Sequence, residues 1–90
     1  MHIPVDVRRK RILYRATHRG TKESDAVVGG FFRENAASLP DDKLDEADEL
    51  LDVADADLMD WFMGRTPVPD RWVGSLFDGV LAYYQSLTKR

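Results

Sequence analysis

Cysteine is absent from this 90-residue chain, which excludes a disulfide framework, thiolate metal ligands and a cysteine nucleophile. Long apolar runs are absent too: none reaches the roughly 18 residues that a membrane-spanning helix needs. The N-terminus also lacks the apolar core of a secretory signal. From these features we expect a bacterial cytoplasmic protein that does not insert into a membrane.

Histidine is scarce, which limits the catalytic sites that the chain could build. Only His2 and His18 are present, so a Ser-His-Asp arrangement would have to form around His18. The pair Gly29-Gly30 is flanked by Val and Phe and lacks the Lys-Ser or Lys-Thr of a phosphate-binding loop. We therefore expect that the chain is not an enzyme and has no catalytic residues.

One acidic cluster offers the oxygen donors that Ca²⁺ prefers. Its members are Asp52, Asp55, Asp57 and Asp60. The segment lacks the glycine at the sixth position and the closing glutamate of a twelve-residue calcium loop. We interpret these carboxylates as helix caps and solvated surface, and we expect the chain itself to bind no metal and no cofactor.

Charge is divided unevenly along the sequence. Residues 1–22 contain seven Lys or Arg and only one acid, Asp6, whereas residues 41–60 contain ten Asp or Glu and only one base, Lys43. We expect the folded molecule to be a charge dipole. The basic residues could contact nucleic-acid phosphates, but the net charge of −3 and the lack of a helix-turn-helix signature disfavour nucleic acid as the partner.

The apolar periodicity predicts an all-α fold, because spacings of three and four recur and no segment alternates as a strand does. The clearest predicted helix begins at Asp70, and its inward face carries Val73, Leu76, Phe77, Val80, Leu81, Tyr84 and Leu87. Four further helices are predicted over residues 7–18, around residues 27–32, after Pro40, and from Asp55 to Gly64. We expect one domain over residues 1–90, a compact bundle of five short helices with residues 1–6 frayed.

Two glycines interrupt the helix predicted around residues 27–32. Gly29 and Gly30 would each cost about 1 kcal/mol in a helix interior relative to Ala. Either a neighbouring helix packs closely against this backbone or the helix ends there, and we favour close packing.

The segment Arg19-Gly20-Thr21-Lys22-Glu23 joins the first two predicted helices. Helix-end chemistry accounts for it in part: Arg19 suits the last turn of one helix, Gly20 a left-handed residue after it, and Glu23 the first turn of the next. The segment can also form a recognition surface, since Gly20 lets a partner's backbone come close between one guanidinium and one carboxylate.

This motif, Arg-Gly-x-x-Glu, resembles the hallmark of the SdhE or succinate dehydrogenase assembly factor 2 family. The resemblance extends over residues 8–88 and includes Leu13-Tyr14-Arg15, Asp25, Phe31-Phe32, Leu39-Pro40-Asp41-Asp42 and Asp55-Ala56-Asp57-Leu58-Met59-Asp60-Trp61. Two positions depart from the family pattern. Pro40 is harmless at a helix start, whereas Ser24 replaces an apolar residue and is expected to loosen the inward packing there.

The resemblance implies an assembly factor, or chaperone, for flavinylation. Family members bind the flavoprotein subunit of succinate dehydrogenase or fumarate reductase and promote covalent attachment of FAD to a histidine of that subunit, so FAD is the cofactor of the partner. By this analogy the partner-binding residues are Arg19, Gly20 and Glu23 at the centre, with Arg11, Tyr14, His18 and Asp25 around them. We expect the free protein to be monomeric.

Two other functions remain open from the sequence. The chain could be a helical protein–protein adaptor for another enzyme, with the same fold but a different partner. It could also bind nucleic acid through its basic N-terminal helix, in which case binding would weaken steeply with salt.

Overall fold

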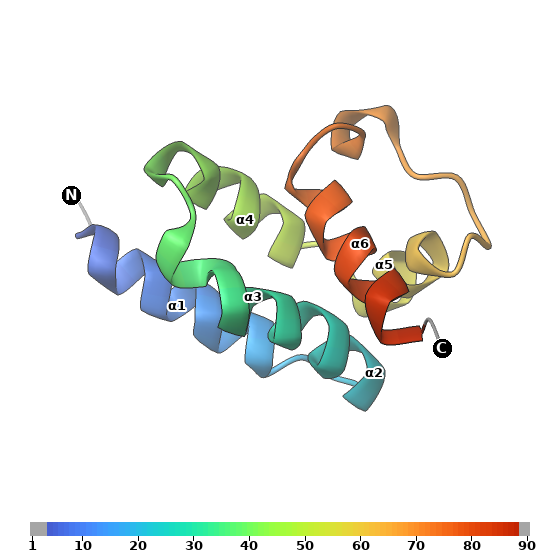
Figure 1. Ribbon diagram of the computed structural model, residues 1–90, viewed down its shortest axis with the longest axis horizontal. Coiled ribbons are helices and arrows are strands. Elements are labelled where there is room, and N and C mark those ends of the chain that lie inside the picture. Colours follow the sequence, from blue (N-terminus) through green and yellow to red (C-terminus); the bar gives the residue numbers. More distant parts are fainter. Residues whose placement is uncertain (1–3, 89–90) are drawn as a thin grey trace.

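Helices make up the regular structure of residues 4–88, the part of the chain that the computed structural model describes (Figure 1). α1 (Val5–Thr17) is followed by a continuous helix over residues 22–35, composed of α2 (Lys22–Ser24), a π-helical segment (Asp25–Gly29) and α3 (Gly30–Asn35). The remaining helices are α4 (Leu44–Leu51), α5 (Asp55–Phe62) and α6 (Leu76–Thr88). With residues 22–35 counted as one helix, the described chain confirms the predicted all-α bundle of five short helices.

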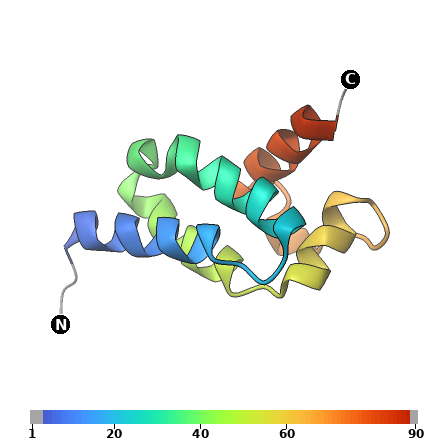
Figure 2. The ribbon, with the colours of Figure 1, turned by 90° about the horizontal axis from the view of Figure 1, so that it is seen from below.

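α1 lies between two neighbours. Residues 22–35 run antiparallel to it, and α4 runs in the same direction as α1 (Figures 1 and 2). α5 and α6 pack at the end of the bundle where α1 stops. The core is continuous through all of these helices, and its most buried large side chains are Ile12, Phe32, Leu44, Leu50, Leu58, Phe77 and Val80.

Close packing explains the glycine pair, as predicted. Gly29 and Gly30 both lie within the helix over residues 22–35. A Cβ added at Gly29 would lie 3.2 Å from the Ala16 carbonyl oxygen of α1, and one added at Gly30 would lie 2.8 Å from Cε2 of Tyr83 in α6. The helix therefore accepts the cost of two glycines because α1 and α6 approach its backbone on two sides.

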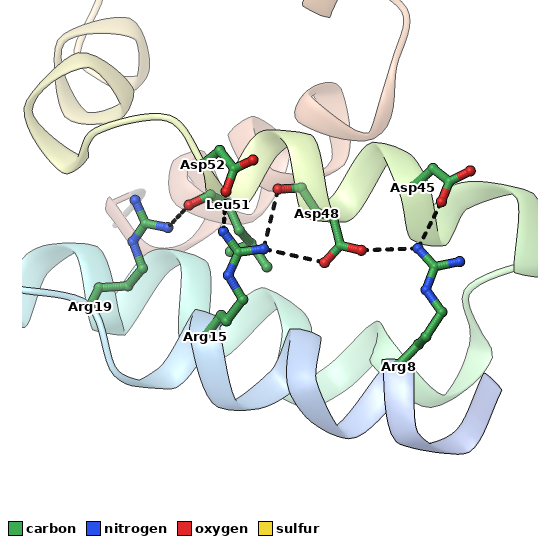
Figure 3. Close-up of polar contacts among 7 residues, drawn as sticks. All are labelled: Arg8, Arg15, Arg19, Asp45, Asp48, Leu51 and Asp52. Atoms are coloured by element: carbon green, nitrogen blue, oxygen red, sulfur yellow. Dashed lines mark hydrogen bonds and ion pairs between the residues drawn. The ribbon is translucent and has the colours of Figure 1, made fainter. Parts of the chain in front are cut away.

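Oppositely charged side chains join α1 to α4 (Figure 3). Arg8 donates to Asp45 at 2.8 Å and to Asp48 at 2.9 Å, and Arg15 pairs with Asp48 and Asp52. Each half-exposed pair contributes at most about 1 kcal/mol, but together they fix the register of the two helices. The expected charge dipole is therefore wrong in this region, because the basic and acidic segments lie side by side.

The C-terminal helix starts later than predicted. Asp70–Trp72 forms a single 3-10 turn, Gly74 has φ +77°, and α6 begins only at Leu76. A residue in the left-handed region cannot continue a helix, so position 73 no longer shares a face with α6. As a result Val73 is 65% exposed, and Leu87, near the end of α6, is 45% exposed; both were predicted to face inward.

Other helix ends differ from the predicted ones by a few residues. α1 includes Val5 and Asp6, within the range expected to fray, and residues 1–3 lie outside the described chain. After Pro40, a 3-10 turn (Asp41–Lys43) precedes α4. Within residues 4–88, each helix is too short or too polar to cross a bilayer.

Phe77 is predicted to be a major source of stability. Its buried ring stacks on Phe62 at a centroid distance of 5.5 Å and meets the edge of Trp61 at 5.9 Å. Phe77→Ala would leave a cavity and should lower the free energy of unfolding by about 3–5 kcal/mol in urea denaturation. Leu87→Ala, on the exposed part of the same helix, serves as the control and should cost less than about 1 kcal/mol. Equal losses for the two variants would contradict this packing.

Candidate functional site

The joint between α1 and α2 contains the whole Arg-Gly-x-x-Glu motif. α1 ends at Thr17, and residues 18–21 form the connection to the next helix (Figure 2). The Thr21 hydroxyl oxygen accepts a hydrogen bond from the Ser24 backbone N–H at 3.1 Å and so caps α2. Glu23 then falls in the first turn of α2, where a negative charge suits the helix dipole.

Arg19 points into the protein. Its Nε donates to Asp55 Oδ1 at 2.5 Å, Nη1 donates to the Leu51 carbonyl at 2.8 Å, and Nη2 donates to the Val53 carbonyl at 2.7 Å. The side chain is only 9% exposed, and Figure 3 shows it reaching the end of α4. Because all three guanidinium nitrogens already have acceptors within the chain, Arg19 fixes the joint, and its contact with a partner stays a prediction.

The Asp55 carboxylate is the acceptor that holds the joint together. Besides Arg19, its Oδ1 accepts from the Ser24 hydroxyl at 2.9 Å, and its Oδ2 accepts from the Gly20 backbone N–H at 3.0 Å. Partial burial alone would raise the pKa of Asp55, but the hydrogen bonds from Arg19 and Ser24, the Arg19 charge and the Gly20 N–H outweigh burial and lower it. Asp55 is therefore a carboxylate kept ionised by the motif.

Asp25 supports the same connection from the other side. Its Oδ1 accepts from the Arg19 backbone N–H at 2.7 Å. Together with the bond from Gly20 to Asp55, this satisfies two successive backbone donors with two carboxylates. Asp25, predicted to lie among the partner-binding residues, is half-buried and engaged within the chain.

Gly20 is exposed at the centre of the joint. The glycines with positive φ are Gly64 and Gly74, so the expectation that Gly20 adopts a left-handed conformation is wrong. A Cβ added at Gly20 would have the Asp55 carboxylate, at 3.5 Å, as its nearest neighbour, which is an ordinary contact distance. Neither its backbone conformation nor packing within the described chain requires a glycine at this position.

Tyr14 and His18 form an exposed aromatic pair beside Gly20. Their rings stack with centroids 3.9 Å apart, and His18 Nδ1 lies 2.8 Å from the Tyr14 carbonyl oxygen. A carbonyl only accepts, so Nδ1 carries a proton and donates to it, which leaves Nε2 available to a partner. The pair borders a cavity of about 410 Å³, whose lining is Tyr14, Arg15, His18, Arg19, Gly20, Leu51 and Asp55.

The remaining predicted contact residues lie on the surface near the joint. Arg11 is exposed on α1, one turn before Tyr14, and His18 follows Tyr14 one turn later. Glu23 is exposed in the first turn of α2 and lines a neighbouring hollow that also includes Asp55. The structure therefore brings Gly20, Tyr14 and His18 together around one cavity, with Arg11 beside Tyr14 and with Glu23 in the hollow that shares Asp55.

The sequence analysis did not identify two residues of the joint, Asp55 and Ser24, as functional residues. Asp55 was interpreted as the cap of its helix, but the cap position is Ala54 and the Asp55 side chain bonds to the motif. Ser24 is fully buried and donates to Asp55, so the expected loosening does not follow. The sequence did contain one signal for this contact. A serine at an inward position of an amphipathic helix indicates a polar partner, because a buried hydroxyl needs a hydrogen bond.

Comparisons with known proteins agree with this structure. A family model described as the flavinator of succinate dehydrogenase matches residues 10–84. The chain is 41% identical over 63 residues to the FAD assembly factor SdhE of Acetobacter pasteurianus, covering 70% of this chain and 58% of that protein. It is 42% identical over 65 residues to the mitochondrial succinate dehydrogenase assembly factor 2 of Mycosarcoma maydis, covering 72% and 27%.

A third relative, the mitochondrial succinate dehydrogenase assembly factor 2 of Meyerozyma guilliermondii, is 38% identical over 73 residues, covering 78% of this chain and 54% of that protein. The matched part therefore spans less than two thirds of the length of each of these relatives. Fold and motif together place the chain in a class of all-helical proteins with an Arg-Gly-x-x-Glu motif at the first helix joint. Within that class, it belongs to the family described as the flavinator of succinate dehydrogenase, as its motif predicted.

The Asp55 carboxylate should make stability at the joint depend on pH. Because its pKa in the folded state lies below the ordinary value of 3.8, its contribution is present above that pH and is lost as the pH falls through the folded-state value. Asp55→Asn should lower the free energy of unfolding by about 2 kcal/mol at neutral pH, and the difference should shrink toward pH 3, roughly one unit below the unfolded pKa.

Guanidinium denaturation across this pH range measures the effect. Asp57→Asn, at an exposed position two residues along α5, is the matched control and should change stability by less than about 0.5 kcal/mol at neutral pH. An Asp55→Asn deficit that stays constant down to the acid limit would refute the role given to the charge.

Proposed function

We propose that this chain binds the flavoprotein subunit of succinate dehydrogenase and promotes covalent attachment of FAD to that subunit. Two facts support the proposal: the chain belongs to a family described as the flavinator of succinate dehydrogenase, and a relative is named FAD assembly factor. FAD is here the cofactor of the partner, and the chain acts as an assembly chaperone and not as an enzyme.

The observation that carries the proposal is the unexplained glycine at the joint. Gly20 is exposed, its conformation is open to other residues, and a Cβ would fit beside Asp55. Because Gly20 has no side chain, it would let a partner backbone come close at this exposed point. Arg19 and Asp25 act indirectly, by holding the backbone of the joint in the shape that the partner meets.

The exposed residues around Gly20 supply the rest of the contact. Tyr14 and His18 offer a stacked aromatic pair with a ring nitrogen available for a hydrogen bond, Arg11 adds a cation, and Glu23 adds a carboxylate. Stacked aromatic side chains give large contact area at a small cost in conformational entropy. This mixture suits a folded protein surface better than a small charged ligand.

The chain would act by selecting a conformation of its partner. The covalent attachment of FAD would take place within the flavoprotein, whose flavin and histidine would supply the chemistry. A binding protein that prefers the productive arrangement tenfold raises its population relative to the other arrangements tenfold. No reacting group of this chain is needed for that effect.

Several finer points belong to the same proposal. The flavoprotein subunit of fumarate reductase would be a second partner, the free chain would be monomeric, and the site of action would be the bacterial cytoplasm. The adaptor alternative differs only in the partner, so capture from an extract of the source organism separates the two: recovery of a different enzyme, with no flavoprotein subunit, would favour the adaptor. Nucleic-acid binding is not favoured, because Arg8, Arg9 and Arg15 are paired with aspartates.

Gly20→Arg should abolish flavin attachment without unfolding the chain. The added side chain extends from an exposed position into the space that the partner backbone would occupy. Co-expression with the flavoprotein subunit, followed by in-gel flavin fluorescence after denaturation, should show at least a tenfold loss of covalent FAD, equivalent to about 1.4 kcal/mol of binding. Circular dichroism should show the same helical content as the original chain.

A matched control adds the same side chain elsewhere. Ala37→Arg lies at an exposed position in the 3-10 turn Ala36–Ser38, beside Asp6 and Arg9 near the start of α1 and therefore at the opposite end of that helix from the joint. This variant should support flavin attachment within about twofold, a difference of less than 0.5 kcal/mol. Normal flavin attachment by a folded Gly20→Arg protein would remove the joint from the proposed function.

A further inference from the structure

A second hollow lies on the other side of Gly20 from the aromatic pair. It runs between the start of α2 and α5, has a volume of about 320 Å³, and is lined by Thr21, Glu23, Asp55, Ala56, Met59 and Met63. Asp55 lines both this hollow and the cavity beside Tyr14 and His18. The groove, as we call this second hollow, is thus continuous with the proposed contact surface.

The floor of the groove is apolar because of how α5 packs. Leu58 and Phe62 of this helix are buried in the core, so Ala56, Met59 and Met63, spaced three and four apart, fall on a different side, which faces the joint. Met63 is 43% exposed, one of the few large apolar side chains so exposed on the described surface. Methionine is unbranched and flexible, which suits a surface that adapts to another apolar side chain.

One carboxylate at the rim of the groove has its charge uncompensated. Among the described residues, Glu23 forms no ion pair, whereas the second acidic residue of the lining, Asp55, is paired with Arg19. The basic residue that lines the cavity beside Tyr14 and His18, Arg15, is paired with Asp48 and Asp52. The groove therefore carries one uncompensated negative charge, which would attract a cation.

We propose that the groove receives an apolar side chain of the flavoprotein subunit, and that Glu23 pairs with a Lys or Arg adjacent to that side chain in the same segment. This inference rests on the proposed function and extends it by naming the chemistry of the partner segment. The segment crosses Gly20, where the missing side chain lets its backbone pass, and places its apolar residue between Met59 and Met63. α5 then belongs to the contact surface together with α1 and α2.

Met63→Gln tests the apolar part of the inference. Glutamine keeps the length and flexibility of methionine but resists burial, so the variant should bind the purified flavoprotein subunit about tenfold more weakly in calorimetry. Met63→Leu retains the apolar character and should bind within about threefold of the original chain. Val73→Thr, at an exposed apolar position outside the groove, is the matched control and should bind unchanged.

Glu23→Gln tests the charged part. Binding of the original chain should weaken as the salt concentration rises from about 0.05 to 0.5 M, because salt screens an exposed ion pair, and the Glu23→Gln variant should lose part of this dependence. The same salt dependence in both proteins would overturn the assigned pairing.

The outcomes of these experiments distinguish a failure of the groove inference from a failure of the proposed function on which it rests. If Gly20→Arg abolishes binding and Met63→Gln binds within twofold of the original chain, the groove is not part of the contact and the proposed function stands. If Gly20→Arg binds and supports flavin attachment normally, neither the joint nor the groove is part of the contact. If the original chain neither binds the flavoprotein subunit nor raises its flavin attachment, the proposed function itself is overturned. Weaker binding by Met63→Gln, restored by Met63→Leu and unaffected by Val73→Thr, supports both.

Discussion

The Asp55 carboxylate is the constraint on which the joint between the first two helices depends. A single side chain at the start of α5 accepts hydrogen bonds from the Arg19 guanidinium, the Ser24 hydroxyl and the Gly20 backbone. Arg19 is nearly buried, and a guanidinium in that position without its carboxylate would carry an uncompensated charge, which is destabilising. Two segments more than thirty residues apart are therefore fixed as one unit, and the shape of the exposed surface follows from that bond.

This arrangement divides the motif between inward and outward residues. Arg19 and Asp25 form hydrogen bonds within the chain. Gly20 and Glu23 remain accessible, and the stacked Tyr14 and His18 lie beside Gly20. The ion pairs between α1 and α4 serve the same end, because they hold the helix that carries the aromatic pair in register (Figure 3). A partner thus meets a preorganised surface, and little ordering entropy is lost on binding.

Local patterns predicted most of the fold. The spacing of apolar residues identified five helices, and the cost of Gly29 and Gly30 predicted the close approach that Ala16 and Tyr83 make. The start of α6 was missed because Asp70 resembles a helix cap in the sequence. In the structure it begins only a 3-10 turn, and the left-handed Gly74 separates that turn from α6. The direction of Arg19 could not be predicted, since it depends on Asp55, thirty-six residues away, being brought beside it by the packing of α4 and α5. The surface positions of Gly20 and Glu23 were predicted correctly, but the inward direction of Arg19 was not.

Hydroxyl-radical footprinting of the unmodified chain, alone and with the flavoprotein subunit, tests the central claim most directly, because methionine and aromatic side chains report their own solvent contact. The joint and groove predict that Tyr14, His18 and Met63 become protected in the complex, while Val73 and Leu87, which are equally open in the free chain, react as before. Protection of Val73 and Leu87 with no change at Tyr14, His18 and Met63 would place the partner on another face and contradict the account.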